Sequence, residues 1–303
     1  MKETPALSHS TRPRESSSAV NGRTPRALHI RQGLPGLVGR HAILILVSIF
    51  MIVPFLWMIR TSLSSSGSVF GASLNVLPEE FHWQNYLEAF TIVPFGAFLL
   101  NSAKVALFVV VGQVITCTLG GYAFARLRFP GRNILFLFVL ATLMIPAQVT
   151  LVPLYIIMQK LSLINTHWAL ILPALASPFG TFLMRQFFVS LPDELEDAAK
   201  VDGASIPQFV RFIAFPMARP MVATLAILAF IGSWGNLIGP LIFLNDLDKA
   251  TVPLGLLQFS SMYATNWSAL MAATTVSLLP SFVLYLFAQR YIISAYSMAG
   301  VQK

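Results

Sequence analysis

Long uncharged apolar runs alternate with short polar connections along most of this chain. A helix needs about 20 mostly apolar residues to cross the hydrocarbon core of a bilayer, and six runs reach or approach that length. They lie at residues 42–59, 105–125, 134–158, 168–184, 221–244 and 269–288. The run at 168–184 is the shortest and contains two prolines, but we still count it as a span. The pattern therefore predicts an all-α integral membrane protein with six transmembrane helices.

Composition supports the same class. The chain is 56% hydrophobic and 11% charged, whereas a soluble globular domain carries roughly 25% charged residues. Residues 1–36 differ from the rest because they are rich in Ser, Thr, Pro and basic residues, a composition typical of disorder. The first apolar run begins only after about 40 residues and lacks a clear small-residue cleavage site, so we interpret it as an uncleaved span rather than a signal peptide.

The positive charges are distributed unevenly between the two sides of the predicted bundle. Of the 20 Lys and Arg residues, seven precede the first span, three follow the second, four follow the fourth and two follow the last. The opposite side holds only Arg60, Lys160 and Lys249. The positive-inside rule then places both termini in the cytoplasm. The net charge of +8 therefore reflects membrane topology, and we expect membrane lipid and no nucleic acid as a partner. For the basic tail, contact with anionic lipid is the alternative to plain disorder.

Several polar groups and prolines interrupt the apolar runs. Proline lies in five of the six spans, and each can leave a backbone carbonyl without its helical partner. Such kinks suit a transport path, although membrane helices also tolerate proline. Two amides, Gln148 and Asn236, are candidate solute-contacting residues together with Trp234, since an aromatic ring can stack on a sugar and amides can bond hydroxyls. Interhelical hydrogen bonding is the alternative for the amides. Neither the single Cys117 nor the five scattered His residues predict a disulfide or a metal site.

The largest cytoplasmic connection, residues 185–220, has its own pattern. Ser190 can cap a helix whose first turn contains Pro192, and Gly203 can end it with a positive φ. Leu195, Ala198, Ala199 and Asp202 are spaced to share one face of that helix. A second helix is expected from Ile206 to Phe215, with Phe209, Phe212 and Ile213 in a stripe and Pro216 ending the pattern. The pair would form either a knob that a partner can approach or a hairpin packed on its own bundle.

In this connection Asp197-Ala198-Ala199, Gly203, Ile213 and Pro216 match the spacing of the EAA loop of ABC importer permeases. From the first span to Lys303 the chain resembles MalG-type carbohydrate permease subunits. Further matching segments are Asn101-Ser102, Tyr122-Ala123-Phe124-Ala125-Arg126, Pro153-Leu154-Tyr155, Asn165-Thr166, Ile171-Leu172-Pro173, Pro178-Phe179-Gly180, Arg185-Gln186-Phe187-Phe188 and Gln289-Arg290-Tyr291. The chain departs from the family pattern at Asp197, which replaces Glu, at Phe215, which replaces Leu, and at Gly235, which separates the usual Trp-Asn pair.

The resemblance implies the type I ABC importer permease fold in a bacterial inner membrane, with residues 37–303 as the permease domain. It also implies a heterodimer with a homologous permease, two ATP-binding subunits and an extracytoplasmic solute-binding protein that delivers a carbohydrate or related polyol. The chain contains no G-x-x-x-x-G-K-[ST] motif. We therefore expect no cofactor or enzyme activity here, with ATP and Mg²⁺ bound by the partner ATPases. The residues expected to couple to those ATPases are Glu196, Asp197, Ala198, Ala199, Asp202, Gly203, Ile213 and Pro216.

The mechanism that the resemblance implies is a lever: ATP-driven closure of the ATPases pushes the EAA loop and rocks the bundle between inward-open and outward-open states. The alternative is a stand-alone secondary transporter or channel. That class usually needs intramembrane carboxylates for ion coupling, and none of the 12 Asp and Glu residues lies inside the predicted spans. A membrane enzyme has less support, because no nucleophile, base and orienting group occur together.

Overall fold

A computed structural model describes residues 34–65, 78, 80–260 and 265–300 of the chain. It separates into two units, residues 1–52 and residues 53–303. The described part of the first unit is the beginning of α1 (Leu34–Ser62). The predicted tail at residues 1–36 lies almost entirely outside the described residues.

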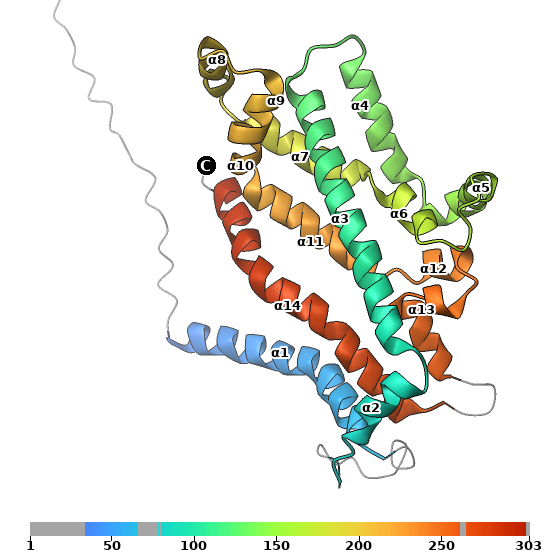
Figure 1. The fold of residues 1–303 in the computed structure, drawn as a ribbon. Helices are drawn as coiled ribbons and strands as arrows, with labels where there is room; N and C mark the ends of the chain where they lie inside the picture. The colour runs from blue at the N-terminus through green and yellow to red at the C-terminus, as the bar shows by residue number, and fades with distance from the viewer. Residues whose placement is uncertain (1–33, 66–77, 79, 261–264, 301–303) are drawn as a thin grey trace, which may run out of the picture. The chain divides into compact units, whose positions relative to one another are not determined.

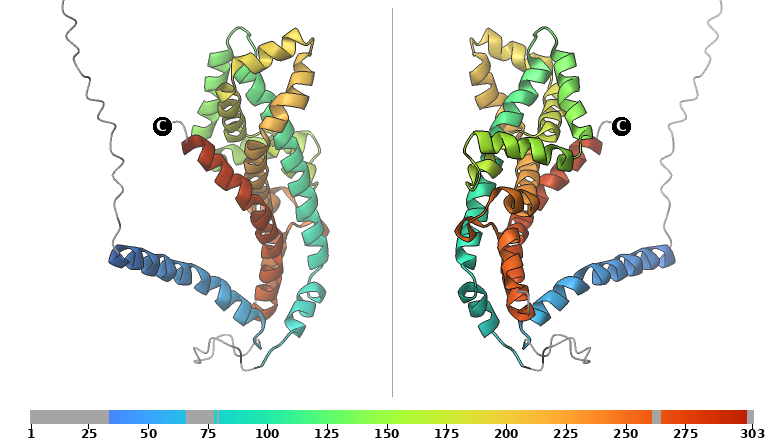
Figure 2. Two further views of the ribbon diagram at one scale, coloured as in Figure 1. Left: turned by 90° about the vertical axis from the view of Figure 1, so that its left-hand side faces the viewer. Right: turned by 90° about the vertical axis from the view of Figure 1, so that its right-hand side faces the viewer.

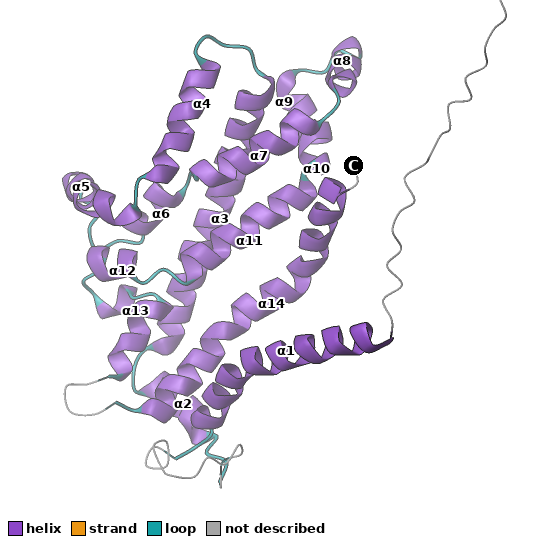
Figure 3. Cartoon of the chain, turned by 180° about the vertical axis from the view of Figure 1, so that it is seen from behind, coloured by secondary structure: helices purple, strands orange, loops and turns teal. Residues whose placement is uncertain are grey.

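The second unit is built from helices throughout its described part, apart from one isolated bridge between Ser260 and Thr265 (Figure 3). After α1 the helices are α2 (Gln84–Thr91), α3 (Phe95–Arg126), α4 (Arg132–Ala141), α5 (Ala147–Lys160), α6 (Trp168–Ala174), α7 (Pro178–Ser190), α8 (Asp193–Val201), α9 (Ile206–Phe209), α10 (Phe215–Met217), α11 (Arg219–Trp234), α12 (Ile238–Phe243), α13 (Val252–Leu256) and α14 (Trp267–Gly300). Short 3₁₀ turns occupy Thr142–Met144, Leu247–Lys249 and Leu257–Phe259, and a π-helical turn occupies Val210–Ala214.

The long helix α3 organises this unit. It packs along α7 on one side and α11 on another, and α11 packs in turn on α14 (Figures 1 and 2). Small residues permit the close approach: a Cβ on Gly121 of α3 would lie 2.5 Å from Cβ of Met184, and one on Gly180 of α7 would lie 2.8 Å from Sγ of Cys117. Glycine at helix crossings is the usual means of bringing membrane helices together.

Four helical segments among the described residues are long and apolar enough to cross a membrane. They are Leu37–Ser62, Phe95–Arg126, Trp168–Ser190 and Trp267–Phe287. Two bent pairs also qualify when each is taken as one span: Arg132–Met144 with Ala147–Lys160, and Ile206–Met217 with Arg219–Trp234. The predicted number of six is the upper limit of this range.

The third and fifth predicted spans, both of which contain proline, are bent or broken rather than straight. The helix axis turns by 104° between α4 and α5, inside the predicted run 134–158, because Ile145 is extended before Pro146 and a residue preceding proline disfavours the helical region. The predicted run 221–244 contains α11 and α12, separated at Gly235–Leu237. This break lies within the glycine- and proline-rich stretch of residues 232–240.

Candidate functional site

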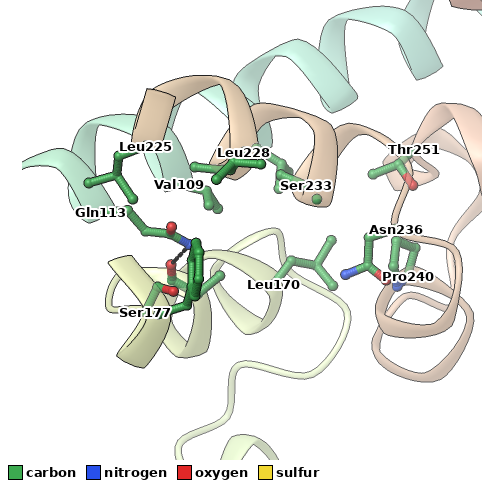
Figure 4. A pocket seen from close by; sticks show the side chains of 15 residues that line it. Val109, Gln113, Leu170, Ser177, Leu225, Leu228, Ser233, Asn236, Pro240 and Thr251 are labelled. Carbon is green, nitrogen blue, oxygen red and sulfur yellow. Dashed lines mark hydrogen bonds between the residues drawn. The ribbon is translucent and has the colours of Figure 1, made fainter. Parts of the chain in front are cut away.

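A cavity of about 400 Å³ lies between α3, the α6–α7 break, α11 and α12 (Figure 4). Its polar lining comes from Gln113, Ser177, Ser233, Asn236 and Thr251. The other lining residues are Val105, Val109, Leu170, Ala174, Phe179, Leu225, Leu228, Ala229, Gly232 and Pro240. The lining thus combines apolar surface with neutral hydrogen-bonding groups and includes no ionisable side chain.

One face of α3 supports the α6–α7 break beside this cavity. Helical bonding is interrupted between α6 and α7, and three neighbouring side chains on one face of α3 donate to backbone carbonyls of this break. Gln113 Nε2 donates to Ala174 O at 2.9 Å, Thr116 Oγ1 to Leu175 O at 2.6 Å and Cys117 Sγ to Ser177 O at 3.4 Å. A membrane interior offers no water to replace such donors, so this row holds the cavity wall in place.

Asn236 begins the turn into α12 and also faces the cavity. Its Oδ1 accepts a hydrogen bond from the backbone N–H of Gly239 at 3.1 Å, while Figure 4 shows its amide nitrogen directed toward Leu170 across the cavity. A second cavity of about 330 Å³ is lined by Asn236 and Gln148 together. The structure therefore brings these two predicted residues to adjoining spaces.

Trp234, the third predicted solute residue, is placed differently. Its side chain belongs to a buried cluster, is 8% exposed and stacks on Phe230 with centroids 5.3 Å apart. Its indole Nε1 donates to Ser277 O at 3.0 Å. Trp234 borders an apolar groove between α3, α11 and α14 rather than the polar cavity. The aromatic ring that does line the cavity is Phe179 on α7, which is 47% exposed and was not singled out from the sequence.

The predicted EAA region forms α8, a turn, and the α9–α10 segment. Gly203 follows α8 with a φ of +78°, as expected, and no atom lies within 4 Å of where its Cβ would be. The Asp202 N–H donates to Ala198 O at 3.0 Å. Ser205 N–H donates to Gln208 Oε1 at 2.8 Å and starts α9. The turn between the helices is thus closed by local hydrogen bonds.

The face predicted on α8 does not lie on one side. Leu195 and Ala199 pack against the buried cluster that contains Tyr122, Phe188 and Phe209, whereas Ala198 and Asp202 are exposed. The i and i+4 apolar pair faces inward because it completes that cluster. Among the other predicted coupling residues, Asp197 and Gly203 are exposed, and Glu196, Ile213 and Pro216 are half-buried.

Three local expectations in this region are wrong. Ser190 is the last residue of α7, where its hydroxyl donates to Phe187 O at 2.7 Å, and it does not cap α8. Pro216 does not end the second helix, because the π-helical turn at Val210–Ala214 absorbs the missing proline N–H and the helix continues to Met217. The aromatic stripe also divides, with Phe209 buried and Phe212 66% exposed.

Lys200 forms ion pairs along α8. Its Nζ lies 3.2 Å from Glu196 Oε1 and 3.4 Å from Asp197 Oδ1. The hydrogen bond with Glu196 raises the pKa of Lys200 most, loss of hydration opposes this increase, and the attraction of the Glu196 and Asp197 carboxylates adds to it. The pairs are surface contacts of small energetic weight, and they engage the Asp197 carboxylate within α8.

A polar cluster that was not predicted as a site lies where the loop before α6 meets the loop before α13. Asn165, with φ +61°, accepts the backbone N–H groups of Asn245 and Asp246 at 3.0 and 3.1 Å and donates to the Asp246 carboxylate at 2.8 Å. Lys249 Nζ lies 2.8 Å from the same carboxylate. The hydrogen bonds from Lys249 and Asn165 lower the pKa of Asp246 below its ordinary 3.8. Within the described ranges no three His, Cys, Asp or Glu side chains lie together as a metal site.

These features define a multi-pass α-helical membrane protein with a neutral cavity between its helices. Residues 117–297 match the family described as binding-protein-dependent transport system inner membrane component. The chain belongs to this family and is a permease subunit of an ABC importer, a transport component rather than an enzyme. Membership implies that it works with a further permease, an ATPase and a binding protein.

Several characterised proteins are similar over most of their length. The chain is 34% identical to the arabinooligosaccharides transport system permease protein of Halalkalibacterium halodurans, covering 84% of this chain and 93% of that protein. It is 34% identical to the diacetylchitobiose uptake system permease protein of Streptomyces coelicolor, covering 85% of this chain and 86% of that protein. It is 33% identical to the sn-glycerol-3-phosphate transport system permease protein of Yersinia pestis, covering 84% and 93%.

The fold is also known from a solved structure. A bacterial ABC transporter involved in the import of the acidic polysaccharide alginate superposes with a TM-score of 0.76 at 21% identity, over 85% of this chain and 98% of that one. The arrangement of α3, α7, α11 and α14 is therefore that of an importer permease.

Proposed function

We propose that this chain forms half of the translocation path for a neutral carbohydrate, a mono- or oligosaccharide or a related polyol. The observation that carries the proposal is the cavity beside α3, whose 15 lining residues include amides, hydroxyls and apolar groups without a charged side chain. Neutral sugars present hydroxyls and apolar ring faces, which such a lining complements. A phosphorylated solute calls for Arg or Lys donors, so we favour a neutral one.

The residues proposed to contact solute follow from this lining. Asn236 and Gln148 supply amides at the adjoining cavities, and Phe179 supplies an exposed ring. Trp234 is left out of the proposed contacts, because its indole is packed and its N–H is already paired.

Coupling is proposed to pass through the connection that contains α8 to α10. The residues available to a partner are the exposed Asp197, Ala198, Asp202 and Gly203. The residues that pack beneath them are the half-buried Glu196, Ile213 and Pro216. Ala199 acts from the inside by holding α8 on the bundle. Lever motion of this region then reaches the helices around the cavity.

The assembly proposed is a heterodimer with a homologous permease, bound by two ATP-binding subunits that hold ATP and Mg²⁺ and supplied by an extracytoplasmic solute-binding protein. Residues 37–303 form the permease domain, with residues 1–36 and the carboxyl terminus in the cytoplasm of a bacterial cell. The excess of Lys and Arg on that side supports the orientation.

Purification from the native membrane in mild detergent tests this assembly. We expect a second permease and an ATPase to copurify, with ATP hydrolysis in the eluate. Recovery of this chain alone, with solute flux that needs no ATP, would instead establish the stand-alone transporter or channel.

A further inference from the structure

Arg126, the last residue of α3, joins that helix to the connection between α7 and α8. Its Nε donates to Phe188 O at 3.0 Å, its Nη2 donates to Leu191 O, and its Nη1 pairs with the Asp193 carboxylate. The Arg126 side chain is 10% exposed, whereas the Asp193 side chain is 85% exposed. One side chain therefore holds the carboxyl end of α7 and the first residue of α8 together.

The chemistry of this contact requires arginine. The planar guanidinium directs several N–H groups to separate acceptors at once, whereas a lysine ammonium acts as a single compact charge on a flexible stem. Phe188 O accepts a long backbone hydrogen bond from Leu191 N–H at 3.4 Å, and Leu191 O lies just past the end of α7. Lysine at this position keeps the charge but cannot satisfy both carbonyls and the carboxylate in the same geometry.

Neighbouring arginines bind the same end of α3 from the other direction. Arg185 of α7 donates to Phe124 O at 3.2 Å and lies over the Phe136 ring of α4 at 4.2 Å. Arg132 of α4 donates to Leu127 O at 3.1 Å. The ends of α3, α4 and α7 are thus held together, and of these three arginines Arg126 is the one that pairs with a residue of α8.

From Arg126 the helix α3 leads directly to the cavity. Gln113, which supports the α6–α7 break, lies 13 residues earlier on the same uninterrupted helix, or about 20 Å at 1.5 Å per residue. Val109 and Val105, two further lining residues, continue along it. A displacement of α8 that pulls on Arg126 therefore moves the cavity wall without passing through a flexible segment.

We propose that Arg126 is a positioning residue that transmits the movement of α8 to α3, and so links ATP hydrolysis on a partner subunit to rearrangement of the cavity. The proposal rests on the proposed function, because it presumes that α8 is moved by an ATPase. Arg126 does not contact the solute cavity. Loss of the Arg126 contact should therefore uncouple ATP hydrolysis from solute transport, while ATP binding and solute binding both remain.

The test uses the complete complex in proteoliposomes and compares Arg126→Lys with Arg128→Lys. Arg128 is two residues away, is exposed and makes no side-chain hydrogen bond or ion pair with the described residues, which makes it the matched control. We expect Arg126→Lys to hydrolyse ATP near the wild-type rate but to move about 10-fold less solute per ATP, within the usual range of coupling free energies. Arg128→Lys should match the wild type. Equal solute per ATP in Arg126→Lys and wild type would overturn the proposal.

A second pair of measurements separates transmission from folding. Asp193→Asn removes only an exposed carboxylate and should lower solute per ATP in an assembled complex, even where Arg126→Lys does not assemble. In an Arg126→Cys, Asp193→Cys variant that also carries Cys117→Ser, we expect a reversible thiol cross-linker to restore coupling and a reductant to remove it. Failure of both Asp193→Asn and the cross-linked variant to change coupling contradicts transmission through this contact. Absence of ATP-dependent uptake by the wild-type complex would instead contradict the proposed function.

Discussion

The amide nitrogen of Gln113, midway along α3, donates to the carbonyl oxygen of Ala174 across 2.9 Å. This bond crosses from a continuous helix to the point where α6 ends, and it lies at the cavity between them. It therefore links the stability of the bundle to the shape of the proposed translocation path.

Replacing Gln113 by Leu keeps the approximate volume of the side chain but leaves Ala174 O without this donor. We expect the purified complex to lose about 1 kcal/mol of unfolding free energy, the scale of interhelical hydrogen bonds in membranes. Gln159→Leu is the matched control, because Gln159 is exposed at the end of α5. Thermal or SDS-induced unfolding measures both variants, and an equal effect of the two substitutions argues against a specific role for the bond.

The turn after α8 depends on a left-handed backbone at Gly203. Gly203→Ala should strain this turn by about 1 kcal/mol, because an L side chain disfavours the φ of +78°. The added Cβ would meet no atom within 4 Å, so no steric clash contributes. Gly131 at the start of α4 has φ +75° and equally open surroundings, so Gly131→Ala carries the same strain outside the proposed coupling region. We expect only Gly203→Ala to lower ATP-driven transport per assembled complex. Equal transport by the two variants would contradict coupling through this turn.

Asn236 is expected to contact solute through its amide nitrogen. Asn236→Asp keeps an oxygen that can accept from Gly239 N–H but replaces the donor, so the start of α12 should remain intact. We predict about 5-fold slower uptake at low solute concentration, corresponding to one lost hydrogen bond of about 1 kcal/mol. Asn133→Asp, at an exposed position near the start of α4, is the control. Unchanged uptake by Asn236→Asp would remove this residue from the solute path.

The Asp246 cluster predicts a pH dependence of stability. Hydrogen bonds from Lys249 and Asn165 lower the folded-state pKa of Asp246 below 3.8, so its stabilisation is fully present above pH 3.8 and declines as pH falls through the folded value. Asp246→Asn should therefore lower the unfolding temperature at pH 7, and the difference from wild type should shrink below pH 3.8. Asp248→Asn, at an exposed neighbour, should show no such convergence. A difference that stays constant with pH would contradict the ion pair.

Much of the fold could be predicted from hydropathy and from the conformational preference of glycine. The apolar runs fall on α1, α3 and α14, and the positive φ at Gly203 followed from its place after an amphipathic segment. The bends between helices were harder to predict, because a proline in the sequence indicates a possible break but does not show whether neighbouring helices accommodate it. At Pro146 the axis turns by 104°, whereas the segments on either side of Pro178 still form one candidate span.

The candidate site shows the same limit at the level of side chains. The sequence named Gln148 and Asn236 because amides are costly in a membrane interior, and both line cavities. It could not distinguish Trp234 from Phe179, since both are aromatic residues in apolar runs and only tertiary packing decides which ring is buried. On α8, likewise, spacing placed Ala198 and Ala199 together, but the cluster around Phe188 selects Ala199 for the interior.

The most direct test of the account is solute uptake by proteoliposomes that contain this chain with its copurified partners. A neutral carbohydrate should accumulate only when ATP is present on the ATPase side and the binding protein is present on the other. Uptake that proceeds equally without ATP and without the binding protein would contradict the role of this chain as an importer permease.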